Sequence, residues 1–196
     1  MKSNSLVDWL DYIDLNRPKE EEFGLKRLHP IRDIILQSTL AEKIVVIGGT
    51  NGKGTSAEFL NNLLIESNFK VGLYTSPHLF NFNERIRING LPVSDAEIIE
   101  AFEEIERIKK DIKLTYFDYA TLAAFIIFTK NILDVVILEI GLGGRYDPVN
   151  LVDSDIAILT NVELDHQKWL GNTREQIGKE KSAIFRDDKT IIMGSN

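Results

Sequence analysis

The sequence contains no cysteine among its 196 residues. This absence excludes disulfides, thiolate metal sites and cysteine nucleophiles. Positive charge is also scarce, because 23 lysines and arginines stand against 30 aspartates and glutamates and leave a net charge of −7. A negative overall field does not attract nucleic acid, although a local positive site can still bind a small anion. We therefore expect no nucleic-acid partner.

Long apolar runs are missing as well. The longest apolar-rich stretches, residues 122–128 and 135–140, are much shorter than the roughly 20 residues that span a bilayer. The first residues lead into an amphipathic stretch and not into the apolar core of a signal peptide. We therefore expect a cytoplasmic protein that does not associate with a membrane.

Short apolar runs alternate with helical patterns along the chain. Strands are expected at residues 44–48, 71–74, 133–140, 156–160 and 190–193. Helices are expected at residues 6–13, 31–38 (with Ile31, Ile34 and Ile35 inward), 57–67, 95–108, 116–128 and 174–185. Alternating residues 82–88 and the turn Asn89-Gly90 predict a hairpin that either lies at the edge of the main sheet or projects from it. The pattern predicts an α/β fold, with a mostly parallel sheet and helices on both of its faces.

The clearest chemical signal follows the first expected strand. The run Ile44-Val45-Val46-Ile47 gives way to Gly48-Gly49-Thr50-Asn51-Gly52-Lys53-Gly54-Thr55 and then to a helical pattern. This order is typical of a phosphate-binding loop, in which backbone N–H groups converge on an anion and a lysine adds positive charge. The loop is shorter than the common G-x-x-x-x-G-K-[ST] motif, and a glycine follows its lysine. An ordinary glycine-rich turn is the alternative.

Three further polar segments are expected near this loop. In a parallel sheet, ligands collect outside the carboxyl ends of the strands, and residues 75–78, Glu139 and residues 161–166 follow or end such strands. Magnesium takes oxygen ligands, few of them from the protein. Glu139 ends an apolar strand, where a metal ion or a lysine would offset the cost of a buried carboxylate. A structural salt bridge is the alternative. His166 is a candidate because of its place on this edge, whereas His29 and His78 are given no role.

Seven motifs then occur in one order along the chain. They are Gly49-Thr50-Asn51-Gly52-Lys53-Gly54-Thr55, Tyr74-Thr75-Ser76-Pro77-His78, Asn83-Glu84-Arg85-Ile86, Leu114-Thr115-Tyr116-Phe117, Leu138-Glu139-Ile140-Gly141-Leu142-Gly143-Gly144-Arg145, Leu164-Asp165-His166 and Glu180-Lys181-Ser182-Ala183-Ile184-Phe185. Together they resemble the dihydrofolate synthase/folylpolyglutamate synthase family of the Mur ligase superfamily. The resemblance implies that residues 1–196 form an N-terminal ATP-binding domain, built like the central domain of a Mur ligase.

That resemblance implies an ATP-dependent amide ligase of folate biosynthesis. In the family, ATP phosphorylates the carboxylate of dihydropteroate or a folate. The amino group of L-glutamate then attacks the acyl phosphate, which gives an amide, ADP and phosphate. Two alternatives remain at this point: a nucleotide- or folate-binding module without catalysis, and a different P-loop ATPase or kinase. The second alternative has no need of the carbamylated lysine that the resemblance implies.

The resemblance also assigns residues to the ATP side of the site. Lys53 and the backbone of Thr50, Asn51, Gly52, Gly54 and Thr55 would bind the ATP phosphates. Ser76, Glu139 and His166 would hold two magnesium ions. Lys181 matches the lysine that the family carbamylates, and with Lys53 and His166 it would be catalytic, because added CO₂ converts an ammonium into a carboxylate-like group. Without the motif, Lys181 would be taken as a solvent-facing helix residue.

The pterin pocket is expected from three segments, which contain Glu20, Glu21, Glu22 and Phe23, then Thr115, Tyr116, Phe117 and Asp118, and then Tyr146, Asp147 and Pro148. Phe117 offers an aromatic face to the heterocycle, with core packing as the alternative, and Asp147 can accept hydrogen bonds from its N–H groups. Pro148 and Val149 replace the alanine and threonine usual in the family. They remove a backbone donor and a hydroxyl, which leaves the fine geometry of the pterin side open and does not affect the ATP side.

Family members are considerably longer than this chain. The resemblance therefore implies that the chain stops before the rest of the ATPase domain and before a second, Rossmann-like domain on the glutamate side. Closure of such a domain excludes water from a reactive acyl phosphate. We expect the chain alone to bind ligands without completing the ligation, and a full-length protein to be a monomer.

Overall fold

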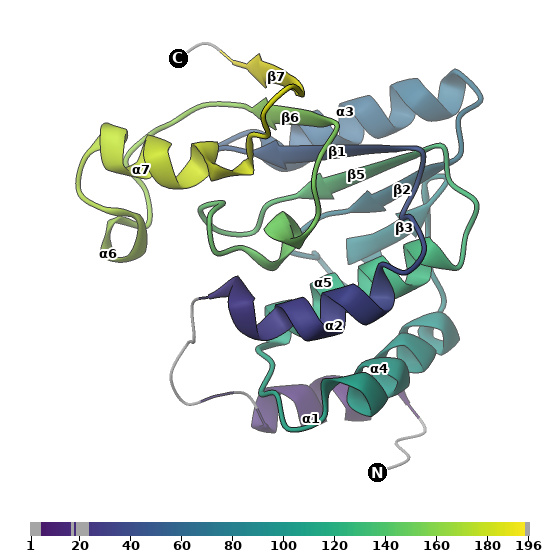
Figure 1. The fold of residues 1–196 in the computed structure, drawn as a ribbon. Helices are drawn as coiled ribbons and strands as arrows, with labels where there is room; N and C mark the ends of the chain where they lie inside the picture. Colours follow the sequence, from purple (N-terminus) through teal and green to yellow (C-terminus); the bar gives the residue numbers. More distant parts are fainter. Residues whose placement is uncertain (1–4, 17, 19–23, 195–196) are drawn as a thin grey trace.

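The computed structural model describes residues 5–16, 18 and 24–194. Within them, one seven-stranded sheet has the order β4-β3-β2-β5-β1-β6-β7 (Figure 1). The strands are β1 (Lys43–Gly48), β2 (Val71–Tyr74), β3 (Ile86–Ile88), β4 (Leu91–Pro92), β5 (Val135–Glu139), β6 (Ile156–Leu159) and β7 (Thr190–Met193). Strands β2, β5, β1, β6 and β7 are parallel, and the β3–β4 hairpin is antiparallel to β2 at one edge. The predicted sheet is confirmed, and the predicted hairpin lies at its edge.

Helices cover both faces of this sheet, as predicted. They are α1 (Leu6–Leu15), α2 (His29–Ile35), α3 (Lys53–Glu66), α4 (Asp95–Lys109), α5 (Tyr116–Thr129), α6 (Gln167–Leu170) and α7 (Arg174–Lys181). Helix α3 packs on one face, and α5 covers the other with α1, α2 and α4 packed around it (Figure 1). In the part of the chain that the structure describes, none of these helices has both the length and the apolar character needed to cross a bilayer.

The main core is built around α5. Every residue of this helix from Asp118 to Phe128 is buried, as its almost uniformly apolar sequence predicts. A capping box sets its first turn: the Asp118 N–H donates to Thr115 Oγ1 at 3.1 Å, and the Thr115 N–H donates to Asp118 Oδ2 at 2.7 Å. The helix therefore starts at a defined residue and places Thr115 and its neighbours beside the carboxyl ends of the strands.

Two predicted details are wrong. Ile34 was expected to face inward, but it is 44% exposed, because Ile31 and Ile35 take the core side of the short helix α2. The alternating residues 82–85 were expected to extend β3, but they form a 3₁₀ turn. The Glu84 carboxylate accepts the backbone N–H groups of residues 79–81, and these bonds close a turn in place of a strand.

The strand register brings the predicted segments to one edge of the sheet. The pairs at that edge are Gly48 with Leu159, Ile47 with Glu139, and Tyr74 with Leu138. The residues that follow β1, β2, β5 and β6 therefore lie side by side, and this confirms the edge predicted from the sequence.

Replacing Phe125, which is fully buried on α5, by alanine should lower the free energy of unfolding by about 3–5 kcal/mol. Phe59 on α3 is 72% exposed, so Phe59→Ala is the matched control and should change that free energy by less than about 0.5 kcal/mol. Urea titrations followed by circular dichroism measure both. Equal losses from the two substitutions would contradict the placement of the core.

Candidate functional site

The first half of the glycine-rich loop is fixed against the segment that follows β6. Asn161 Oδ1 accepts the backbone N–H groups of Thr50 at 3.2 Å and Asn51 at 2.9 Å, and Thr160 Oγ1 donates to the Asn51 carbonyl at 2.7 Å. A Cβ on Gly49 would lie 1.8 Å from Thr160 Oγ1, and its φ is 143°. Only glycine allows the loop to approach Thr160 this closely in that conformation.

The second half of the loop begins helix α3 and leaves backbone donors unused. Gly52, with a φ of 78°, precedes Lys53, the first helical residue, and the Ser56 N–H donates to the Gly52 carbonyl at 2.9 Å. In the described part of the chain, the N–H groups of Lys53, Gly54 and Thr55 have no partner. Such N–H groups, at the positive end of a helix, form an anion site.

Two lysines converge on the carbonyl of Gly49. Lys53 Nζ donates to it at 3.1 Å and to the Thr50 carbonyl at 3.2 Å, and Lys181 Nζ donates to the Gly49 carbonyl at 2.9 Å. Lys181 is only 4% exposed, so the alternative of a solvent-facing lysine is wrong. Burial, with a further contribution from the Lys53 charge, lowers the pKa of Lys181 to about 8, while Asp165 acts in the opposite direction. Near neutral pH, more of this side chain is therefore the neutral amine than in an ordinary lysine.

Glu139 ends β5 next to the start of α3, where a Cβ on Gly54 would lie 3.6 Å from Glu139 Oε1. It is 4% exposed, and its Oε2 accepts the backbone N–H of Ser76 at 3.0 Å. Burial raises the pKa of Glu139, and the Ser76 N–H, Lys53 and Arg85 act against that rise. Among the described residues Glu139 makes no salt bridge within 4 Å, so the structural salt bridge offered as an alternative finds no partner there.

His166 lies on the segment that follows β6. Its side chain is 55% exposed, and its Nε2 is 3.5 Å from Asp165 Oδ2. It forms no hydrogen bond or ion pair with Ser76 or Glu139. Within residues 5–16, 18 and 24–194, no group of three or more His, Asp or Glu side chains is arranged to hold a metal ion. The structure thus brings Ser76 and Glu139 together and leaves His166 near the surface.

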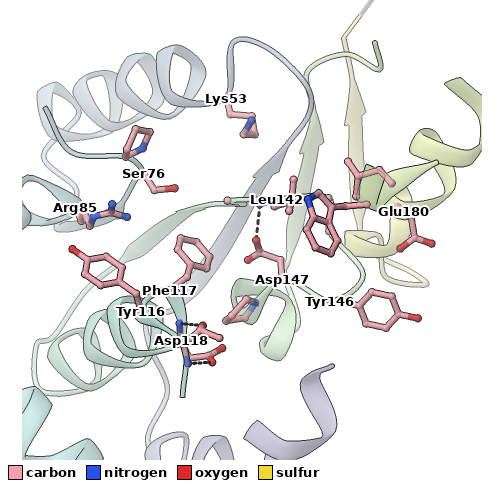
Figure 2. Close-up of a pocket in the computed structure, with 18 of the residues that line it drawn as sticks. Lys53, Ser76, Arg85, Tyr116, Phe117, Asp118, Leu142, Tyr146, Asp147 and Glu180 are labelled. Atoms are coloured by element: carbon pink, nitrogen blue, oxygen red, sulfur yellow. Dashed lines mark hydrogen bonds between the residues drawn. The ribbon is translucent and has the colours of Figure 1, made fainter. Parts of the chain in front are cut away.

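A pocket of about 690 Å³ opens next to the loop (Figure 2). It is lined by Pro18, Arg27, Lys53, Ser76, Pro77, Arg85, Thr115, Tyr116, Phe117, Asp118, Gly141, Leu142, Gly143, Gly144, Tyr146, Asp147, Pro148, Trp169, Leu170 and Glu180. It therefore joins the loop lysine to both predicted pterin segments that the structure describes. The third predicted segment, Glu20 to Phe23, lies outside the described residues.

Asp118 is engaged in holding the pocket together. Besides the Thr115 N–H, its Oδ2 accepts Arg27 Nη2 at 2.8 Å, and its side chain is 2% exposed. Arg27 belongs to the 3₁₀ turn Leu25–Leu28, so this ion pair joins that turn to the start of α5. Asp118 lines the pocket, as predicted, and its visible contacts are structural.

Asp147 is the buried carboxyl group at the other end of the pocket. Its Oδ2 accepts the Leu142 N–H and its Oδ1 the Val149 N–H, both at 2.9 Å (Figure 2 shows the first). Burial raises the pKa of Asp147 to about 7 against these hydrogen bonds. Pro148 occupies the first position of a 3₁₀ helix, where no N–H is needed, and Val149 is fully buried. Pro148 and Val149 are therefore accommodated at the start of this 3₁₀ helix, and Asp147 still caps the helix by accepting the Val149 N–H.

The glycines after β5 permit close packing around the pocket. A Cβ on Gly141 would lie 2.4 Å from Phe117 Cζ, and one on Gly144 would lie 2.9 Å from the Lys181 carbonyl. These glycines therefore let the Phe117 ring and the end of α7 approach β5. The Phe117 ring also lies 6.1 Å from the ring of Tyr74, so Phe117 packs against the core and faces the pocket at the same time.

A comparison with known families identifies this architecture. Residues 47–193 match the family model described as the Mur ligase middle domain. The chain belongs to the Mur ligase family. It is 43% identical over 192 residues to the dihydrofolate synthase/folylpolyglutamate synthase of Escherichia coli (strain K12), an alignment that covers 98% of this chain and 46% of that relative.

Solved structures of Mur ligases agree with the fold. The structure of E. coli FolC in complex with DHPP and ADP has a TM-score of 0.94 and 42% identity, over 97% of this chain and 46% of that one. A bifunctional folylpolyglutamate synthase/dihydrofolate synthase with Mn, AMPPNP and L-glutamate bound has a TM-score of 0.91 and 43% identity, with the same two coverages. The chain thus spans about half the length of the Mur ligases that it matches.

Arg85, Trp169 and Arg27 are among the pocket residues of this Mur ligase domain that were not assigned from sequence. Arg85 belongs to a recognised motif, but its sequence pattern gives no direction for its side chain. Trp169 is 47% exposed on the four-residue helix α6, too short a helix to show periodicity. Arg27 meets Asp118 across 91 positions of sequence, and no local signal predicts such a contact.

Replacing Lys181 by methionine should stabilise the domain at pH 7, and the gain should shrink as the pH rises from about 8 to 10.5. The pKa of Lys181 in the folded protein is about 8, below the 10.5 of an ordinary lysine. Between these two pH values the unfolded state binds more protons than the folded state, so the stability of the wild type rises with pH. The predicted change across the window is about 3 kcal/mol, at 1.36 kcal/mol per pKa unit.

Denaturant titrations in CO₂-free buffer measure this difference at each pH. Lys179→Met is the control, because Lys179 is exposed on the same helix. The difference in stability between Lys181→Met and wild type could instead stay constant from pH 7 to 10.5. That result would show that Lys181 is not a buried amine with a lowered pKa.

Proposed function

We propose that this chain is the ATP- and acceptor-binding part of an amide ligase of folate biosynthesis. A carboxylate oxygen of dihydropteroate or a folate attacks the γ-phosphorus of ATP and releases ADP. The amino group of L-glutamate then attacks the acyl carbon, and phosphate leaves. One observation carries the proposal: a single pocket joins Lys53 and Ser76 at one end to Phe117 and Asp147 at the other.

The nucleotide end consists of the loop and the start of α3. The N–H groups of Lys53, Gly54 and Thr55 would accept phosphate oxygens, and Lys53 Nζ would exchange the Gly49 and Thr50 carbonyls for phosphate. Thr50 and Asn51, whose N–H groups are bound to Asn161, would give the loop its shape. The binding of ADP and AMPPNP by related structures supports this assignment.

A magnesium ion fits the oxygen atoms beside this end. The Glu139 carboxylate and the Ser76 hydroxyl are hard oxygen donors, and Glu139 has no salt-bridge partner of its own among the described residues. When bound, the ion would neutralise phosphate charge. A related structure holds Mn, which takes similar ligands. A second ion and a role for His166 stay predictions.

Lys181 is suited to carbamylation. Its neutral amine can attack CO₂, which forms an N–C bond and releases one proton, so that a buried cation becomes an anion. The lowered pKa supplies the neutral amine, and the adjacent Lys53 supplies a positive charge to stabilise the carbamate. We infer that the carbamate assists metal binding next to the phosphates, as the resemblance implies.

The acceptor end takes the pterin. Phe117 would stack on the heterocycle, and Asp147 would accept hydrogen bonds from the N–H groups of the pterin. The pocket is also lined by Thr115, Tyr116, Tyr146 and Pro148. Asp118 would fix this part of the pocket through its bond with Arg27. A binding module without catalysis is the second candidate, and it would use the same pocket and the same loop. The monomeric state, the cytoplasmic location and the absence of a nucleic-acid partner stay predictions.

Glu139→Gln should weaken Mg-ADP binding by about tenfold, because the amide loses the charge that binds a cation, and leave metal-free ADP binding unchanged. Isothermal titration calorimetry with and without magnesium measures both. Glu66→Gln, an exposed change at the end of α3, removes the same charge elsewhere and is the control. Magnesium-dependent binding that survives in Glu139→Gln would remove this residue from the metal site.

Phosphate release from ATP should depend on both dihydropteroate and L-glutamate when the chain is mixed with the C-terminal half of the E. coli relative. The chain alone should bind nucleotide and release little phosphate, because the C-terminal half is expected to exclude water from the acyl phosphate. Each substrate is omitted in turn as a control. Nucleotide binding without turnover in either mixture would favour the non-catalytic module, and steady ligation by the chain alone would contradict the need for the second half.

A further inference from the structure

Arg85 is a buried cation in the pocket wall, and no carboxylate among the described residues lies within 4 Å of its guanidinium. It ends the 3₁₀ turn Phe82–Arg85, is 8% exposed and lines the pocket. Its guanidinium makes no salt bridge within the described residues, whereas its neighbour Arg87 pairs with Glu58. A buried charge without a partner costs several kcal/mol unless a ligand compensates it.

The surroundings of Arg85 hold the guanidinium in one orientation. Its Nε donates to His78 Nδ1 at 2.8 Å, and its Cζ lies 5.8 Å from the ring centre of Phe82 and 5.6 Å from that of Tyr116. The hydroxyl of Tyr74 is also close. None of these four side chains is a carboxylate. Glu139 interacts with Arg85 only from beyond salt-bridge distance, and Figure 2 shows the outer guanidinium nitrogens directed into the pocket.

We propose that Arg85 binds the carboxylate of the acceptor, the group that receives the phosphate. The planar fork of a guanidinium matches a carboxylate through two parallel hydrogen bonds. Arg85 lies over Tyr116, next to the aromatic acceptor end, while the phosphate donors belong to α3. This assignment rests on the proposed function. His78 is a positioning residue, because its Nδ1 fixes the guanidinium from the side away from the ligand.

The test compares dihydropteroate with its carboxamide, which keeps the rings and lacks the charge. The wild-type chain should bind the carboxylate about tenfold or more tightly, the ratio expected of one charge-assisted hydrogen bond. Arg85→Gln should reduce carboxylate affinity to that of the carboxamide and leave carboxamide affinity unchanged. Arg85→Lys, which keeps the charge if the glutamine variant fails to fold, should keep part of the preference. Arg87→Gln is the matched control and should keep all of it.

The variants of His78 test its positioning role. His78→Ala should lower the preference for the carboxylate, and His78→Asn, whose amide oxygen can replace Nδ1 as acceptor, should restore it. A structural role alone would weaken carboxylate and carboxamide binding together, and that result would overturn the assignment.

The remaining outcomes separate this assignment from the proposed function. Equal binding of both compounds by wild type would overturn the role of Arg85 and leave the acceptor site standing. Binding of neither compound would contradict the proposed acceptor, and the Arg85 assignment with it. Loss of Mg-ADP affinity in Arg85→Gln with an intact carboxylate preference would place Arg85 at the phosphates and overturn the proposal.

Discussion

The site depends on one backbone carbonyl, that of Gly49, which accepts hydrogen bonds from both Lys53 and Lys181. Lys181 comes from a helix end 132 positions away in sequence. The contact forms because Gly144 admits the end of α7 next to β5, and because Asn161 and Thr160 fix the loop that presents the carbonyl. Burial of Lys181, with a further contribution from the Lys53 charge, lowers its pKa to about 8 and raises its neutral fraction, which suits the carbamylation proposed for this end of the pocket.

Three charged or ionisable side chains at the pocket are also buried without a salt bridge among the described residues. Glu139, Asp147 and Arg85 are each more than nine-tenths buried, and none forms a salt bridge within the described residues. Backbone N–H groups or an imidazole nitrogen fix each of them in position. Rigid, uncompensated groups of this kind favour ligands that bring the opposite charge or the missing hydrogen bonds. A metal ion, a pterin edge and a carboxylate are the corresponding partners.

Much of the fold follows from local sequence. Periodicity predicts the strands and helices, and the rule that parallel strands end at one edge correctly brings the loop, Ser76 and Glu139 together. The remainder depends on contacts between distant segments. The burial of Lys181 needs Gly144, and the direction of Arg85 needs His78 and Tyr116. No pattern within a single segment predicts the burial of Lys181 or the direction of the Arg85 side chain. The seven motifs indicate which segments form the site, but they do not give the distances and directions of its side chains.

The most direct test of the account is a crystal structure of the chain with Mg-ADP and dihydropteroate. We predict that the β-phosphate lies at the N–H groups of Lys53, Gly54 and Thr55, the metal on Glu139, and the pterin between Phe117 and Asp147. A pterin bound outside this pocket, or a nucleotide phosphate away from the start of α3, would contradict the claim that one pocket joins the two substrates.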